Sequence, residues 1–193
     1  STLVRAAFGM LKQASISGQI LLNGTDVSTL SDGDWRQLRG TKISMIFQNP
    51  SAYLNPYRTV ENHFKDLFLA HGESYEVSRV INMLQLVHLT DGERILQSYP
   101  FQLSGGMQQR LAIALSLILK PSIVFADEPT SALDMLVQAS VLDLLKEVTQ
   151  ALGATVVIVT HNIKAAGHIA NSIGVMHKGQ LVEEIGRASC RER

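Results

Sequence analysis

The chain has 193 residues, of which 46% are hydrophobic and 18% are charged, and its formal net charge is zero at pH 7. This length allows one well-packed core and a small subdomain, and the balanced charge gives no indication of a nucleic-acid-binding surface. No apolar run approaches the roughly 20 residues of a membrane-spanning helix, and no charged-then-apolar leader predicts a secretory signal. The single cysteine, Cys190, cannot form an internal disulfide, which fits a reducing compartment.

The N-terminal half predicts short elements separated by turn-forming residues. Apolar residues recur at helical spacing over residues 1–12, and we expect a helix there. Gly18 to Gly24 predicts a strand between turn formers, and residues 31–34 are typical of the start of a helix that continues to Leu38. Residues 42–48 predict a buried strand, and residues 59–97 predict helices.

The C-terminal half alternates helices with strands. In order, we expect a helix after Ser104, a strand at 122–127, a helix at 136–152 ended by Gly153, a strand at 155–159, a helix at 163–169, and a hairpin of strands at 173–176 and 180–183. The continuous β-branched run at 155–159 predicts a strand covered on both faces. Alternating strands and helices predict an α/β fold with a mostly parallel sheet, into which a helical subdomain at about 59–120 is inserted.

Two motifs carry the candidate chemistry. Ser104-Gly105-Gly106 opens a helix, and two glycines let an anion approach the free amides at a positive helix end. Asp127 and Glu128 end an apolar strand, where one carboxylate can hold Mg²⁺ and its neighbour can activate water. An ordinary N-capped helix and a pair of solvated carboxylates are the alternatives. Gln48 precedes these motifs and His161 follows them, each directly after a predicted strand.

In this order and spacing the motifs resemble those of the ATP-binding subunits of ABC transporters, over nearly the whole chain. The resemblance implies a P-loop NTPase-like fold with part of an antiparallel β subdomain, a nucleotide-binding domain at 1–184, and ATP and Mg²⁺ as cofactors. The segment 48–56 resembles the group that serves importers of oligopeptides, dipeptides and nickel. A soluble ABC-type ATPase of a non-transport machine, such as the C–P lyase system, and a truncated frame without activity are the alternatives.

The resemblance also implies roles for residues of the catalytic half-site. Ser1 and Asp127 would hold the metal, with Gln48 near both the metal and the attacking water. Glu128 would orient and deprotonate that water. Thr2 would lie on the phosphates and His161 would contact the γ-phosphate. From the residues alone, Ser1 and Thr2 could instead be a helix N-cap. The other histidines have no ligand-like spacing, so we expect no zinc site.

A second half-site would face a partner. The resemblance implies that Ser104, Gly105 and Gly106 bind the γ-phosphate held by a second nucleotide-binding subunit, in a homo- or heterodimer. Gln108, which continues this motif, and Asp134 would also contribute to nucleotide binding. Asp134 lies in the loop that crosses the dimer interface, or it caps a helix. The loop after Gln48 would contact transmembrane permease subunits, which implies a peripheral position on the cytoplasmic face of the inner membrane. No nucleic-acid partner is expected.

We make a separate prediction for each end of the chain. A phosphate-binding loop has the form G-x-x-x-x-G-K-[ST], and the chain begins at the final Ser1-Thr2. We therefore expect the chain as given to bind ATP weakly and not to hydrolyse it. Residues 185–193 are similar to a translated sequencing adapter, and we expect a non-native tail there; a genuine basic tail is the alternative.

Overall fold

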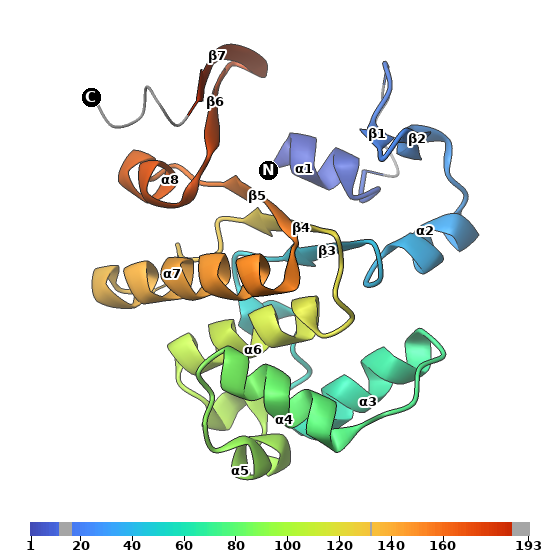
Figure 1. The fold of residues 1–193 in the computed structure, drawn as a ribbon, viewed down its shortest axis with the longest axis vertical. Helices are drawn as coiled ribbons and strands as arrows, with labels where there is room; N and C mark the ends of the chain where they lie inside the picture. The colour runs from blue at the N-terminus through green and yellow to red at the C-terminus, as the bar shows by residue number, and fades with distance from the viewer. Residues whose placement is uncertain (12–16, 132, 187–193) are drawn as a thin grey trace.

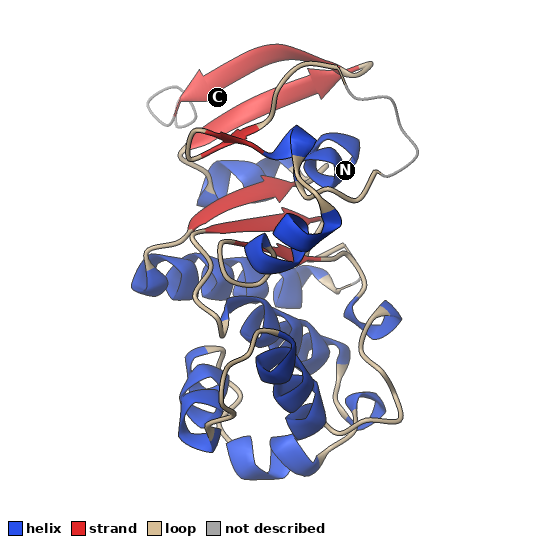
Figure 2. Cartoon of the chain, turned by 90° about the vertical axis from the view of Figure 1, so that its right-hand side faces the viewer, coloured by secondary structure: helices blue, strands red, loops and turns tan. Residues whose placement is uncertain are grey.

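The computed structural model describes residues 1–11, 17–131 and 133–186. Figure 2 shows the layers from top to bottom: a hairpin, a layer of short helices, a parallel sheet, and two tiers of helices beneath the sheet. None of the helices in the described ranges is both long and apolar enough to cross a membrane.

The parallel sheet has three strands in the order β3-β4-β5. β3 covers Ile43–Ile46, β4 covers Ile123–Asp127 and β5 covers Thr155–Val159. Ile46 pairs with Ala126, and Asp127 pairs with Val159, so the three strands end at one edge. Residues that follow these strands are therefore brought to the same edge although they are far apart in the sequence.

Eight α-helices and three short 3-10 helices lie in the described ranges (Figure 1). The α-helices are α1 Thr2–Ala7, α2 Asp32–Leu38, α3 Val60–Ala70, α4 Val77–Leu86, α5 Gly92–Gln97, α6 Gly105–Leu117, α7 Met135–Leu152 and α8 Ile163–Ile169. The 3-10 helices are η1 Val27–Thr29, η2 Pro50–Ala52 and η3 Pro100–Gln102. Helix α6 lies between the sheet and the helices α3, α4 and α5, and most of its residues from Leu111 to Leu117 are buried.

The sheet separates two hydrophobic cores because successive strand residues point to opposite faces. Val124 and Ala126 of β4 belong to the larger core, which continues through α3 to α7 and includes Phe64 and Leu144. Phe125, between them, belongs to the smaller core beneath α1 and α2. The helices α3 to α5 thus share their core with α6 and α7, and the expected boundary of a separate helical subdomain at 59–120 stays a prediction.

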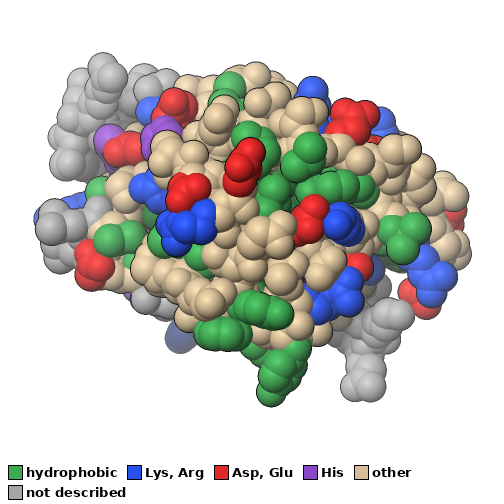
Figure 3. All heavy atoms as spheres, turned by 90° about the horizontal axis from the view of Figure 1, so that it is seen from below, with side chains coloured by type: hydrophobic (Ala, Val, Ile, Leu, Met, Phe, Trp, Pro, Cys, Tyr) green, Lys and Arg blue, Asp and Glu red, His purple; other side chains and the backbone are tan. Residues whose placement is uncertain are grey.

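The outer face of the helical tier carries charges of both signs side by side (Figure 3). Ion pairs on α3 to α5 and their connecting segments account for much of this pattern: Arg58–Asp66, Lys65–Glu61, Arg79–Glu73 and Arg94–Asp91. Such exposed pairs contribute little to stability individually, so the tier is held mainly by its buried apolar residues.

Two expected elements differ from the structure, and one strand was not expected. The helix predicted at 1–12 ends at Ala7, because Gly9 adopts a left-handed conformation (φ +70°) against the ring of Trp35; residue 12 lies outside the described ranges. The strand predicted from Gly18 to Gly24 is only β1, Leu21–Leu22. It pairs with β2, Thr25–Asp26, which sequence analysis did not predict.

The prediction that the strand at 155–159 is covered on both faces is wrong. β5 lies at an edge of the described three-stranded sheet, and Val157 is 40% exposed. A β-branched apolar run predicts an extended strand, but its cover depends on which neighbours the fold brings to it.

The C-terminal hairpin and the turn before β5 agree with expectation. Gly153 ends α7 in the left-handed conformation, and β6, Ser172–His177, pairs antiparallel with β7, Gln180–Gly186. Ile185 and Gly186 of the expected tail are paired residues of β7. The rest of that tail, residues 187–193, lies outside the described ranges.

Candidate active site

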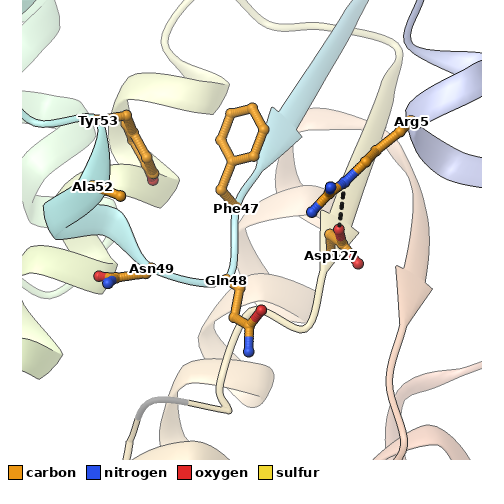
Figure 4. Close-up of a pocket in the computed structure, with 7 residues that line it drawn as sticks. All are labelled: Arg5, Phe47, Gln48, Asn49, Ala52, Tyr53 and Asp127. Carbon is orange, nitrogen blue, oxygen red and sulfur yellow. Dashed lines mark ion pairs between the residues drawn. The ribbon is translucent and has the colours of Figure 1, made fainter. Parts of the chain in front are cut away.

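The buried carboxylate of Asp127 ends strand β4 and is only 3% exposed. The Ser1 hydroxyl donates a hydrogen bond of 2.7 Å to Oδ1 of Asp127, and Arg5 Nε lies 3.5 Å from Oδ2 (Figure 4). A buried charge is tolerated where its oxygens are paired in this way. Ser1 is the N-cap residue of α1, yet its side chain makes no capping bond. The structure therefore favours the pairing with Asp127 over the simple N-cap interpretation of Ser1.

Glu128 follows directly in a backbone conformation that is rare for residues other than glycine, with φ +49°. Its amide donates to the Val159 carbonyl at 2.8 Å, which holds Glu128 against the end of β5. Non-glycine residues in this region carry a cost of about 1–3 kcal/mol and are concentrated at functional sites.

Gln48, Glu128 and His161 come together at this edge of the sheet. Gln48 Nε2 donates to Glu128 Oε2 at 3.4 Å, and His161 Nδ1 lies 3.2 Å from Glu128 Oε1. Each of the three residues follows a different strand of the parallel sheet. The carboxylate thus lies between an amide and an imidazole, and it stays accessible enough to accept a proton from water.

A cavity of about 270 Å³ opens beside Asp127. Arg5 and Asp127 line one side of it, and Gln48 and the following residues line the other (Figure 4). The complete lining is Arg5, Phe47, Gln48, Asn49, Ala52, Tyr53 and Asp127. The cavity therefore joins the carboxylate of β4 to the loop after Gln48.

The donor set fits Mg²⁺, which prefers oxygen ligands and takes one or two from carboxylates. The Ser1 hydroxyl and Asp127 carboxylate already meet at 2.7 Å, and the amide oxygen of Gln48 is a third candidate ligand beside the same cavity. Among the described residues, no group of three or more His, Cys, Asp or Glu side chains could hold a metal ion. Magnesium would therefore take its remaining ligands from phosphate oxygens and water.

The Ser104 turn, Ser104-Gly105-Gly106, lies at the start of α6 and packs near the start of α7. Ser104 accepts a 3.3 Å bond from the Met107 amide. A β-carbon on Gly106 would lie 3.3 Å from Val137, so larger residues would press on α7. Asp134 caps α7 by accepting from the Val137 amide at 3.1 Å. The cap interpretation of Asp134 is thus confirmed, while its part in a dimer interface stays a prediction.

The two predicted half-sites are separate in the structure. Within the part of the chain that the structure describes, no hydrogen bond or ion pair joins the Ser104 turn to Asp127, Glu128 or His161. Thr2 is the first residue of α1 and is exposed. Gln108 uses its side chain within the chain, bonding Ser51, Pro100 and Leu103. Contacts of Thr2 and Gln108 with a nucleotide stay predictions.

Sequence analysis missed Arg5 and Ser51. Arg5 follows Ser1 by four positions on α1, so both face the same direction; that spacing could have identified Arg5 as a partner of the Asp127 carboxylate. Ser51 reaches Gln108 across 57 positions, and no local pattern indicates such a contact.

The family model described as "ABC transporter" matches residues 1–131. The oligopeptide transport ATP-binding protein OppD of Lactococcus lactis subsp. cremoris (strain SK11) is 37% identical over 189 residues, covering 95% of this chain and 56% of the relative. The dipeptide transport ATP-binding protein DppD of Bacillus subtilis (strain 168) is 41% identical over 169 residues, covering 86% of this chain and 50% of the relative. The chain therefore spans about half the length of these relatives.

Solved structures agree in fold. A post-hydrolysis dimer of the ATP-binding cassette MJ0796, bound to ADP and Pi, has a TM-score of 0.75 at 31% identity and covers 89% of this chain and 74% of that one. The structure of cbiO1 from Clostridium perfringens, part of the transporter complex cbiONQ, has a TM-score of 0.78 at 28% identity and covers 96% of this chain and 71% of that one. Since the family model spans more than half of its residues, this chain belongs to the ABC transporter family.

Proposed function

We propose that the chain is the ATP-binding part of a peptide importer and that the parent protein hydrolyses ATP with Mg²⁺. The observation that carries the proposal is the convergence of Gln48, Glu128 and His161 at the strand edge, beside the pair of Ser1 and Asp127. The relatives named for oligopeptide and dipeptide transport favour peptides as cargo over nickel, and an importer over a non-transport machine.

In the proposed reaction each residue of the edge has a separate task. Asp127 and Ser1 hold the metal, which when bound neutralises charge on the phosphate oxygens. Glu128 accepts a proton from the attacking water. Gln48 and His161, which bracket the Glu128 carboxylate at 3.4 and 3.2 Å, orient it, and His161 also contacts the γ-phosphate.

The proposed assembly uses the second half-site. The exposed Ser104 turn would bind the γ-phosphate of ATP held by another nucleotide-binding subunit, as expected for amides at a helix start. The loop after Gln48 would contact permease subunits at the cytoplasmic face of the membrane. ATP binding would close the dimer and hydrolysis would reopen it, which would gate the permease.

The pattern G-x-x-x-x-G-K-[ST] of a phosphate-binding loop does not occur within the 193 residues given. We therefore expect the isolated chain to bind ATP weakly and to show no steady hydrolysis, whereas the full-length protein hydrolyses ATP. Phosphate release at native-like rates from the isolated chain would contradict this expectation.

The function is tested with the full-length protein that carries this chain, in cells that lack the ATP-binding subunit of an oligopeptide importer. We expect the protein, supplied with its neighbouring permease genes, to restore peptide uptake, and Glu128→Gln to abolish uptake at equal protein levels. Restored uptake of nickel without uptake of peptides would contradict the proposed cargo, and equal uptake by Glu128→Gln would contradict the catalytic assignment.

A further inference from the structure

One side chain connects the loop after Gln48 to the Ser104 turn. Ser51, in η2 of the loop after Gln48, donates through its hydroxyl to Gln108 Oε1 at 2.7 Å. Gln108 lies in the first turn of α6, two positions after Gly106 of the Ser104 turn. Its Nε2 donates at 3.0 Å to the carbonyls of Pro100 and Leu103, which precede that turn. The Gln108 amide therefore contacts both the loop after Gln48 and the segment that precedes the Ser104 turn.

The chemistry of the partners fixes the orientation of this amide. Two backbone carbonyls can only accept, so the NH₂ group of Gln108 must face Pro100 and Leu103 and must use both of its hydrogens there. Its oxygen then faces the Ser51 hydroxyl, which must donate. A flipped amide would place its oxygen against two carbonyl oxygens, so one arrangement satisfies all three partners.

The residues at the two ends of this connection make further hydrogen bonds. The Asn49 side chain accepts from the Ser51 amide at 3.1 Å, which fixes Ser51 within η2. On the other side, the Pro100 carbonyl also accepts from the Leu103 amide at 3.1 Å, within η3. A shift of η2 relative to α6 therefore has to break the bond between Ser51 and Gln108 or move the Ser104 turn.

We propose that Gln108 is a positioning residue that couples the loop after Gln48 to the Ser104 turn. Its biological meaning rests on the proposed function: the loop would receive the permease and the turn would receive the partner's nucleotide. The bond between Ser51 and Gln108 would then transmit movement of the loop at the permease contact to the Ser104 turn at the nucleotide contact, and the reverse.

The test is hydrogen–deuterium exchange of the full-length protein that carries this chain, without nucleotide, followed in peptides that cover residues 50–54 and 102–108. We expect Ser51→Ala to raise exchange in both peptides by about fivefold, which corresponds to the loss of one ordinary hydrogen bond. Gln108→Leu is expected to have the same effect in both peptides. The double variant should add little to either single change, since both remove the same connection.

Two control variants distinguish coupling between the two segments from a local increase in exchange. Ser51→Thr keeps the hydroxyl and should restore slow exchange in both peptides. Ser98→Ala removes a hydroxyl that bonds only the Arg94 carbonyl in its own turn, and should leave both peptides unchanged. If Ser51→Ala raises exchange at 50–54 only, or if the two single variants add fully, the coupling is overturned.

This outcome is independent of ATP chemistry, because no nucleotide is present in the exchange experiment. Failure of the proposed function would appear separately, as absence of ATP binding by the unsubstituted full-length protein. The two failures are therefore distinguishable.

Discussion

Nδ1 of His161 lies 3.2 Å from Oε1 of Glu128, although the two residues follow different strands of the sheet. Gln48 approaches the other carboxylate oxygen at 3.4 Å. A carboxylate bracketed in this way is oriented on both sides, which is the arrangement that a general base needs.

From this arrangement we expect Glu128→Gln, in the full-length protein, to lower ATP hydrolysis by about 10²–10⁴-fold, the contribution of a positioned general base. Nucleotide binding should be preserved, because the amide keeps the size of the side chain and Glu128 is assigned to the attacking water rather than to the phosphates. Phosphate release and equilibrium binding of ATP measure the two effects separately.

The matched control is Glu183→Gln, which changes an exposed glutamate on β7. Its hydrolysis rate should equal that of the unsubstituted protein. Retention of hydrolysis by Glu128→Gln at the control's rate would exclude Glu128 as the general base.

The paired carboxylate of Asp127 predicts a stability effect. Asp127→Ala leaves the Ser1 hydroxyl and Arg5 without their buried partner, and we expect the free energy of unfolding to fall by about 1–3 kcal/mol in urea titrations. Asp143→Ala, which removes an exposed partner of His168, should change it by less than about 1 kcal/mol. Equal losses in the two variants would contradict the buried pairing.

Metal addition and removal probe the same carboxylate. Mn²⁺ with ATP should raise the thermal midpoint of the unsubstituted full-length protein above its value with ATP and a chelator, because a ligand that binds only the native state stabilises it. Asp127→Asn should lose most of this metal-dependent rise. If Asp127→Asn shows the full metal-dependent rise in thermal midpoint, the metal does not bind at Asp127.

The close approach of Gly9 to Trp35 predicts a steric penalty. Gly9 and Gly179 both have left-handed backbones, with φ +70° and +80°. A β-carbon at Gly9 would lie 2.4 Å from the Trp35 ring, whereas nothing lies within 4 Å of one at Gly179. We expect Gly9→Ala to cost about 1–3 kcal/mol more than Gly179→Ala in unfolding titrations, because the core around Trp35 is filled. Equal losses of stability in Gly9→Ala and Gly179→Ala would show that the Trp35 ring moves aside to accept the added β-carbon.

In the capping box at the start of α2, Ser31 and Asp34 hydrogen-bond each other. This contact predicts that stability depends on pH in the acid range. Hydrogen bonds from the Ser31 hydroxyl and, second, from its backbone amide lower the pKa of Asp34 below the usual 3.8. Because the folded pKa lies below the unfolded one, this contribution is present above about pH 4 and is lost as the pH falls through the folded value.

Asp34→Asn removes the titrating group, so the stability advantage of the unsubstituted chain should shrink as the pH falls below about 4. Ser31→Ala removes the bond from the hydroxyl and keeps the bond from the backbone amide, so it should reduce the same pH-dependent difference. Urea midpoints from pH 7 to pH 2 measure it. If the urea midpoints of the unsubstituted chain and of Asp34→Asn change in parallel across this range, the capping box does not shift the pKa of Asp34.

Much of the fold could be predicted from local patterns. The apolar runs at β3, β4 and β5, the stripe of α7 and its end at Gly153 depend on side-chain spacing and turn chemistry, which are properties of short segments. Element ends were less predictable. The ring of Trp35, 26 positions away from Gly9, helps to decide where the first helical segment stops.

By itself, the sequence determined the family, the alternation of strands and helices, and the strand ends at which Gln48, Asp127, Glu128 and His161 stand. Parallel strands end at one edge, so this order alone places those residues together. Only the tertiary structure decided that Ser1 bonds Asp127, that Arg5 shares that carboxylate, and that Gln108 joins Ser51 to the segment before the Ser104 turn. The spacing of Ser1 and Arg5 places both on one face of α1, but only the packing of distant segments brings Asp127 to that face and Ser51 to Gln108.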